Sequence, residues 1–286
     1  MFRAYGRMIS PGLTWLSGFE HIEHLALDLW QEESFDILGN FTNLRSLSLG
    51  ETASRRPSLA FLRRLPQLKR LWLEAHDRDF DAVAEVTGLA HLGLRVPRAR
   101  SLDPLRGHPG IQVLTMAFGG IRDLVPLTHM PQLRGLELYQ VRGLDTGDFD
   151  VLGECCALEA VSLGAMRNIG SLRALARHPA ETLQMLNLEK LTGLATLADL
   201  AACHKLTQLG LYDSRPADKR LDVLLEIPAL RHLVVGDVYP AEQVHIMRDS
   251  FRGQTLRYRA ETIRGDMRNV AVRWRQPVHA YLGILD

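Results

Sequence analysis

The segment Ile111–Leu138, IQVLTMAFGGIRDLVPLTHMPQLRGLEL, contains the pattern that decides the fold. It begins and ends with one apolar cluster, L-x-x-L-x-L, first as Ile111-Leu114-Met116 and then as Leu133-Leu136-Leu138. The fourth and sixth positions of the cluster alternate with other residues, which is typical of a short strand with those two side chains in a core. Between the clusters, apolar residues follow at every third position from Leu124 to Met130, which favours a 3₁₀ or short α-helical segment on the same core.

The cluster recurs along most of the chain at intervals of 21 to 25 residues. Its first residues are Ile22, Leu44, Leu68, Leu89, Ile111, Leu133, Leu158, Leu183, Leu206 and Leu230. A degraded copy is predicted to begin at Leu256, and the coil that ends in the Leu183 cluster breaks the three-residue register, with Leu172 and Leu175 placed early. One strand-turn-helix coil cannot bury both of its apolar edges, but stacked coils share a continuous core. The sequence therefore predicts a solenoid of about ten coils.

This spacing resembles that of leucine-rich-repeat proteins. The segment 119–127, GGIRDLVPL, is similar to the short-repeat class found in internalins. The resemblance implies an α/β solenoid, an arc with a parallel β-sheet on the concave face and short 3₁₀ or α segments on the convex face. One feature departs from the family pattern, because the ninth repeat position, usually Asn or Cys, holds other residues here: Trp30, Thr52, His76, Pro97, Gly119, Val141, Met166, Leu191, Ser214 and Val238.

Both ends of the solenoid need caps over their terminal apolar faces. We expect an N-terminal cap over residues 1–12, including an edge strand or turn, a solenoid over 13–239 and a C-terminal cap over 240–286. Within the C-terminal cap, the segment Pro240–Phe251 predicts a short helix, because proline is favoured in a first helical turn. Alternating residues predict strands over 255–263 and 270–275, joined by a hairpin turn at 264–266.

The third, fifth and seventh positions of each cluster are expected to point away from the core, and we call the surface that they form the outward face. Trp72 lies there with a large apolar ring, and Trp, Tyr and Arg are the residues that most often anchor interfaces. Glycine and alanine at neighbouring positions are expected to leave room for a partner's side chains. The alternative is that these are scattered surface residues. We predict a protein-binding surface formed by Arg70, Trp72, Glu74, Arg95, Glu137, Tyr139, Glu189, Tyr212 and Asp213.

Charge gives a second, weaker hypothesis. The chain has 34 Lys and Arg against 33 Asp and Glu, which argues against a whole-molecule attraction to nucleic acid or to an anionic membrane. Residues 248–275 nevertheless contain eight arginines and three acids. Nucleic-acid binding through this arginine cluster is the alternative function, although a solvated face of an amphipathic hairpin is the favoured interpretation.

The remaining reactive residues do not suggest chemistry. Cys155 and Cys203 share one repeat position two coils apart, about 10 Å and too far for a disulfide, so with Cys156 they are interpreted as buried, reduced thiols. His21 and His24 lie on opposite faces of a strand and are not expected to bind a metal. We expect no metal or cofactor and no enzymatic activity, since no catalytic motif occurs, although an active site assembled across strands stays open.

Together these patterns predict a cytoplasmic protein–protein interaction module. The N-terminal residues do not resemble a secretory signal, and no apolar run reaches the roughly 20 residues of a membrane helix. Resemblance to small bacterial leucine-rich-repeat proteins suggests an inhibitor or immunity factor against a toxin. The sequence does not predict the partner's identity or the oligomeric state.

Overall fold

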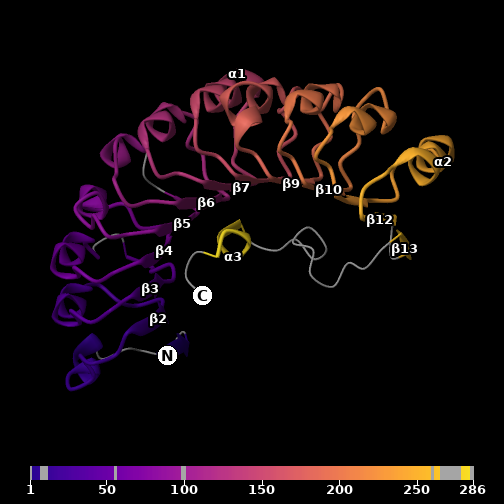
Figure 1. The fold of residues 1–286 in the computed structure, drawn as a ribbon. Helices are drawn as coiled ribbons and strands as arrows, with labels where there is room; N and C mark the ends of the chain where they lie inside the picture. Colours follow the sequence, from indigo (N-terminus) through magenta and orange to yellow (C-terminus); the bar gives the residue numbers. More distant parts are fainter. Residues whose placement is uncertain are drawn as a thin grey trace. The chain divides into compact units, whose positions relative to one another are not determined.

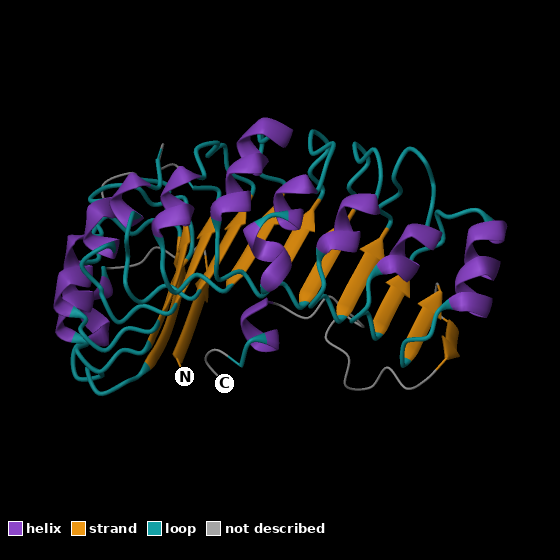
Figure 2. Cartoon of the chain, turned by 45° about the horizontal axis from the view of Figure 1, so that its top comes forward, coloured by secondary structure: helices purple, strands orange, loops and turns teal. Residues whose placement is uncertain are grey.

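The structure, a computed structural model, describes residues 2–6, 12–54, 57–97, 101–258, 261–264 and 278–283. The chain divides into two compact units: unit 1 ends at Gln132 and unit 2 begins at Leu133. Each unit is a stack of coils, and each coil contributes one strand and, as a rule, one short helical segment (Figure 1). Except for the helix Val278–Tyr281, the helical segments of each unit lie along one side of its strands (Figure 2). The predicted solenoid of parallel strands and short 3₁₀ segments is therefore confirmed.

Unit 1 contains six strands in sequence order, each parallel to its neighbour. The strands are β1 (Phe2–Gly6), β2 (His24–Leu29), β3 (Ser46–Leu49), β4 (Arg70–Glu74), β5 (His91–Arg95) and β6 (Val113–Ala117). The 3₁₀ helices are η1 (Leu13–Leu16), η2 (Asp36–Asn40), η3 (Ala60–Arg64), η4 (Phe80–Val83), η5 (Asp103–Leu105) and η6 (Val125–His129).

Unit 2 contains seven strands, of which all but the last run parallel. The strands are β7 (Gly135–Tyr139), β8 (Ala160–Gly164), β9 (Met185–Glu189), β10 (Gln208–Tyr212), β11 (His232–Val235), β12 (Thr255–Tyr258) and β13 (Glu261–Arg264). The helical segments are α1 (Thr146–Asp150), η7 (Val151–Glu154), η8 (Arg173–Ala176), η9 (His178–Glu181), η10 (Ala198–Ala202), η11 (Asp222–Glu226), α2 (Ala241–Ser250) and α3 (Val278–Tyr281).

The core contains the residues that the repeat predicts. At the fourth and sixth cluster positions no side chain is more than 3% exposed, from Leu25 and Leu27 on β2 to Leu233 and Val235 on β11. Residues at equivalent positions are register partners on adjacent strands. Leu186 on β9, for example, is in register with a core residue on β8 and another on β10. Burying one leucine or isoleucine contributes about 1.5 to 3 kcal/mol, so the repeat itself supplies most of the driving force for stacking.

Backbone hydrogen bonds stabilise the turns that follow the strands, where other leucine-rich-repeat proteins have an Asn or Cys at the ninth position. The eighth repeat position has a positive φ in seven successive coils: Ala75, Val96, Phe118, Gln140, Ala165, Lys190 and Asp213. At Ala75, Val96, Gln140, Ala165 and Lys190, the N–H donates to the carbonyl of the seventh position in the next coil, as from Lys190 to Tyr212 at 2.7 Å. At the ninth position, only some coils retain a polar tie, such as that between His76 Nε2 and the Gly50 carbonyl oxygen at 2.9 Å.

A positive φ strains any residue that has a Cβ. Gln140 is exposed and has a φ of 49°, so substitutions there measure this backbone strain. We expect Gln140→Gly to raise the free energy of unfolding by about 0.5 to 1 kcal/mol, because the relief of strain exceeds the entropy cost of glycine. The β-branched variant Gln140→Val is expected to be less stable than the wild type, and Gln140→Ala close to it. Urea denaturation measures all three, and a Gly variant less stable than the Ala variant would contradict the argument.

The C-terminal region differs from the prediction in two respects. Leu256 pairs with Leu233 and so occupies a fourth position, not the first position of a degraded cluster. The predicted strand over 255–263 is instead two strands, β12 and β13, which pair antiparallel. The predicted hairpin turn at 264–266 lies largely outside the described residues. The predicted helix corresponds to α2, and the predicted strand 270–275 lies outside the described residues.

Two further expectations concern the ends and the register of the coils. The expected N-terminal edge strand corresponds to β1, which pairs with β2. The coil with the broken register uses two 3₁₀ helices, η8 and η9, and keeps Leu172 and Leu175 in the core. The boundaries of the caps stay a prediction.

Candidate functional site

The nine predicted partner-binding residues fall into two groups, one in each unit. Arg70, Trp72 and Glu74 lie on β4 and Arg95 lies at the end of β5, so these four are neighbours on the outward face of unit 1. The other five belong to unit 2, where Glu137 and Tyr139 lie on β7, Glu189 on β9, and Tyr212 at the end of β10 with Asp213 after it.

Trp72 is half-buried, and its ring lies flat on the neighbouring strand. Gly93 is its register partner on β5, and a Cβ at Gly93 would overlap the indole ring. The glycine thus provides the space in which the ring rests. Because the ring packs against backbone on one side, its orientation is restricted before any partner arrives.

An ion pair and a cation–π contact restrict the Arg95 side chain in unit 1. Arg95 forms an ion pair with Glu74 on the adjacent strand, and the Arg95 guanidinium lies 5.2 Å from the centroid of the Phe118 ring. The Arg95 side chain is 44% exposed, so the pair itself adds little stability but holds a cation beside Trp72. Together, Arg70, Trp72, Glu74, Arg95 and Phe118 form a mixed aromatic and charged surface, which we call the unit 1 patch.

Some outward positions in unit 1 are buried, which the alternating pattern did not predict. His91, Val113 and Thr115 are at most 8% exposed although they do not point into the core between sheet and helices. His91 Nε2 and Thr115 Oγ1 are 3.3 Å apart. Alternation assigns a face to each side chain but contains no information on whether that face is covered.

In unit 2, the seventh positions of four adjacent strands are in register: Tyr139, Gly164, Glu189 and Tyr212. All but the glycine are aromatic or acidic. The Tyr139 ring occupies the space where a Cβ of Gly164 would lie, as Trp72 does on Gly93. Likewise, a Cβ at Gly210 would lie 2.6 Å from Tyr212 Cε2 and 2.7 Å from Asn187 Oδ1. The expectation that these glycines leave room for a partner is therefore wrong, since the protein's own side chains fill the space.

Two of the predicted partner-binding residues, Glu137 and Asp213, have structural roles within the chain. Glu137 Oε1 accepts a hydrogen bond of 2.8 Å from the backbone N–H of Val278, so part of the outward face of unit 2 already contacts another segment of the chain. Asp213 has a positive φ of 54° and belongs to the turn that leaves β10. The sequence contained no signal for the Val278 contact, because the two residues are 141 positions apart.

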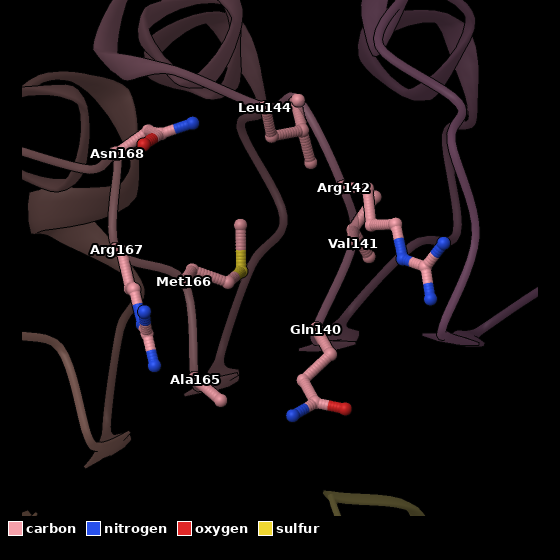
Figure 3. A pocket seen from close by; sticks show the side chains of 9 residues that line it. Gln140, Val141, Arg142, Leu144, Ala165, Met166, Arg167 and Asn168 are labelled. Carbon is pink, nitrogen blue, oxygen red and sulfur yellow. The ribbon is translucent and has the colours of Figure 1, made fainter.

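A surface cavity of about 460 Å³ lies between the turns that follow β7 and β8 (Figure 3). Met166 and Leu144 line its apolar part, and Arg142 and Arg167 belong to its rim. The two guanidinium groups lie on opposite sides of the cavity (Figure 3), so they do not converge on a common anion. The cavity separates two turns and shows no arrangement typical of catalysis.

The cysteines are separated as expected, with one correction. Cys155 and Cys203 are buried, and burial raises the pKa of each thiol to about 12, which keeps both protonated and unreactive at neutral pH. Cys156 is exposed and donates a hydrogen bond to the Glu154 carbonyl at 3.4 Å, so its predicted burial is wrong. The adjacent residue occupies the core position of the repeat, which turns Cys156 outward.

Four of the eight arginines in the cluster, Arg248, Arg252, Arg257 and Arg264, belong to the described residues. Within the described part, Arg248 and Arg252 are exposed on and after α2, and Arg252 Nη1 donates to the Asp249 carbonyl at 2.6 Å. No group of three His, Cys, Asp or Glu side chains suited to a metal occurs among the residues that the structure describes. No helix in the described part of the chain is long and apolar enough to cross a membrane.

Comparison with known proteins identifies the fold. An internalin (inlF) of Listeria monocytogenes superimposes with a TM-score of 0.63 over 93% of this chain and 75% of its own, at 19% sequence identity. A second Listeria internalin (inlC2) gives a TM-score of 0.52 over 65% of this chain and 80% of its own, at 20% identity. A chain of the Drosophila Toll–Spatzle complex gives 0.51 over 77% of this chain and 34% of its own, at 16% identity. No protein-family model and no curated protein sequence matches. The chain therefore has the leucine-rich-repeat fold predicted from its sequence.

Proposed function

We propose that this protein is a binding module that recognises another protein through the outward face of its sheet. The observation that carries the proposal is the unit 1 patch, in which Trp72 rests on Gly93 and Arg95 is held between Glu74 and Phe118. Its composition matches that of interface centres, where Trp, Tyr and Arg are enriched.

Restricted side chains favour binding, because association otherwise costs about 0.5 to 1.5 kcal/mol for each flexible side chain that becomes fixed. In the unit 1 patch, the backbone of β5 restricts the indole and an ion pair restricts the arginine before the partner arrives. Parallel strands also hold neighbouring side chains at a fixed spacing of about 4.8 Å. The fold likewise supports the proposal, since the Toll–Spatzle structure with the same fold is a complex of proteins.

The test is quantitative capture of a partner by purified protein and its variants. We expect Trp72→Ala and Arg70→Glu each to weaken partner binding by about 30-fold or more, as substitution of an interface anchor typically costs about 2 kcal/mol. Trp15→Ala on η1 and Arg122→Glu are matched controls, since Trp15 is 38% exposed and Arg122 is exposed outside strands β4 and β5. Both controls should bind like the wild type.

Two outcomes would contradict the proposal. Equal binding by all four variants would place the contact elsewhere. Recovery of DNA or RNA that dissociates at moderate salt would favour the arginine cluster as a nucleic-acid site. Thermal unfolding of each variant shows that a loss of binding does not reflect a loss of the fold.

The finer part of the proposal concerns the partner. We propose a toxic bacterial protein that this chain neutralises in the cytoplasm. Resemblance to small bacterial leucine-rich-repeat proteins supports it, and three free cysteines are consistent with a reducing compartment. Identification of the captured partner as a non-toxic protein would remove this part and leave the binding proposal intact.

A further inference from the structure

The helix α3 lies on the outward face of unit 2, below β7 in the view of Figure 1. It contacts β7 and β8, which precede it by more than 110 residues in the sequence. The N–H of Val278, the first residue of α3, donates to Glu137 Oε1 on β7 at 2.8 Å. A segment from the C-terminal part of the chain therefore occupies the surface on which we expect a partner.

Apolar burial accompanies this contact. The Val278 side chain is 0% exposed. The outward third positions of β7, β8 and β9 are Gly135, Ala160 and Met185, and the side chains of Ala160 and Met185 are also 0% exposed. Small residues on β7 and β8, the two strands that α3 contacts, let a helix approach the sheet closely.

The far end of α3 lies near a polar side chain. The Tyr281 phenol lies near the Thr207 side chain, just before β10, which partly offsets the effect of burial on the pKa of Tyr281. Burial raises the pKa of Tyr281, so the phenol is neutral at physiological pH. The first turn of α3 is thus held by the hydrogen bond to Glu137, and its last residue, Tyr281, lies near Thr207 beside β10.

One buried polar atom on β9, next to Gly210 on β10, has no hydrogen-bond partner among the described residues. Asn187 on β9 is 3% exposed, and its Oδ1 accepts no hydrogen bond from any residue that the structure describes. An unsatisfied buried acceptor costs about 1 to 3 kcal/mol, so an occupant that donates a hydrogen bond to it gains that amount in affinity. Helix α3 therefore does not use every contact that this surface offers.

We propose that residues 278–283 are an intramolecular ligand of the outward face of unit 2, which a partner must displace. The partner segment that fits is a short helix with an aliphatic side chain over Ala160 and Met185, an N-terminal N–H for Glu137 and a donor for Asn187. This inference rests on the proposed function only for the partner; the intramolecular contact can be tested alone.

The test uses the full-length chain and a fluorescein-labelled peptide with the sequence of residues 276–286. A tethered segment competes at an effective concentration of about a millimolar, so the wild type should bind the peptide weakly. Val278→Asp places a charge in a fully buried position and should release the segment. We expect this variant to bind the peptide at least 10-fold more tightly by fluorescence anisotropy.

Three controls make the result specific. Val125→Asp, at a valine that is 38% exposed in unit 1, should behave like the wild type. Adding Ala160→Arg to Val278→Asp should abolish peptide binding, because the arginine fills the surface under α3. A peptide with the same Val278→Asp change should not bind. If Val278→Asp reduces the stability of the protein, Tyr281→Ala provides the same test at the other end of α3.

Equal peptide affinity for the wild type and both release variants would overturn the proposal, as would binding that survives Ala160→Arg. Conversion of a dimer to a monomer by Val278→Asp, measured by light scattering, would show that the segment comes from a second copy and would overturn its intramolecular assignment. Failure of partner capture at the unit 1 patch affects none of these measurements. Once a partner is captured, equal capture by the wild type and Val278→Asp would overturn the competition.

Discussion

Replacing His108 with alanine is expected to lower the free energy of unfolding by about 3 to 5 kcal/mol. The loss is this large because the buried histidine, although polar, has hydrogen-bond partners for both ring nitrogens. His108 is 3% exposed and connects two coils. Its Nδ1 accepts hydrogen bonds from the N–H groups of Gly110 and Ile111, at 3.1 and 3.2 Å. Its Nε2 lies 3.2 Å from the Val86 carbonyl oxygen of the preceding coil and must donate to it. Alanine removes a buried ring and leaves these backbone groups without a partner.

The same contacts give this effect a characteristic pH dependence. Burial lowers the pKa of His108 below its usual value, because the site accommodates the neutral ring and its Nδ1 is an acceptor. A histidine whose pKa falls on folding stabilises the protein fully above the unfolded value of about 6.5, and this stability is lost as the pH falls from there toward the folded value. The loss has a limiting slope of about 1.4 kcal/mol per pH unit for one proton.

Urea denaturation at pH 7.5 and pH 5.5 tests both statements. The wild type should lose more stability between these values than His108→Phe, which keeps the ring volume but cannot be protonated. Some dependence should remain in the variant, because burial also lowers the pKa of His232. His204→Ala removes an exposed histidine and should change stability by less than about 0.5 kcal/mol. An equal pH response in the wild type and His108→Phe would exclude His108 as its source.

The repeat could be predicted because the information is local. Two side chains per strand point inward, and every coil repeats them, so an irregular coil still stands out against nine similar ones. The extra residues before the Leu183 cluster are an example: they disturbed the spacing, but they are accommodated as a second 3₁₀ helix while Leu172 and Leu175 stay in the core.

The state of the outward face could be predicted only in part. The sequence identified the aromatic residues at outward positions. The glycines on which their rings rest were not recognised, although the repeat alignment contains them. Trp72 and Tyr139 are each followed, at the same position of the next coil, by a glycine: Gly93 and Gly164. In a parallel sheet these pairs are direct neighbours, so a large ring beside a missing side chain indicates a ring that lies down on the sheet.

The contact of α3 could not be predicted from periodicity. Val278 and Glu137 belong to no common repeat, and nothing in the outward residues of β7 and β8 distinguishes a covered surface from a free one. Gly135 and Ala160 looked like open space for a partner, and the structure shows that part of this space is taken by the chain itself. Long-range contacts of this kind depend on shape, which a repeat pattern does not encode.

The shared core also predicts the cost of a single gap in it. Leu186 on β9 is fully buried and lies in register with Val161 on β8 and Leu209 on β10. Leu186→Ala is expected to lower the free energy of unfolding by about 3 kcal/mol, because the lost apolar burial is joined by the cost of the cavity. Since each coil of a solenoid is stabilised by its neighbours, the cavity weakens two interfaces at once.

Leu225 on η11 provides a matched control, because it is 38% exposed and the same substitution removes the same atoms. Leu225→Ala should cost less than about 1 kcal/mol. Urea denaturation of both variants measures the difference, and the slope with denaturant shows whether unfolding stays cooperative. Similar losses for the two variants would mean that β9 does not share a core with β8 and β10. We expect a large loss of stability for Leu186→Ala and not for Leu225→Ala, because neighbouring coils stabilise one another through the shared core. If each coil were stable by itself, the effect of Leu186→Ala would be confined to one strand.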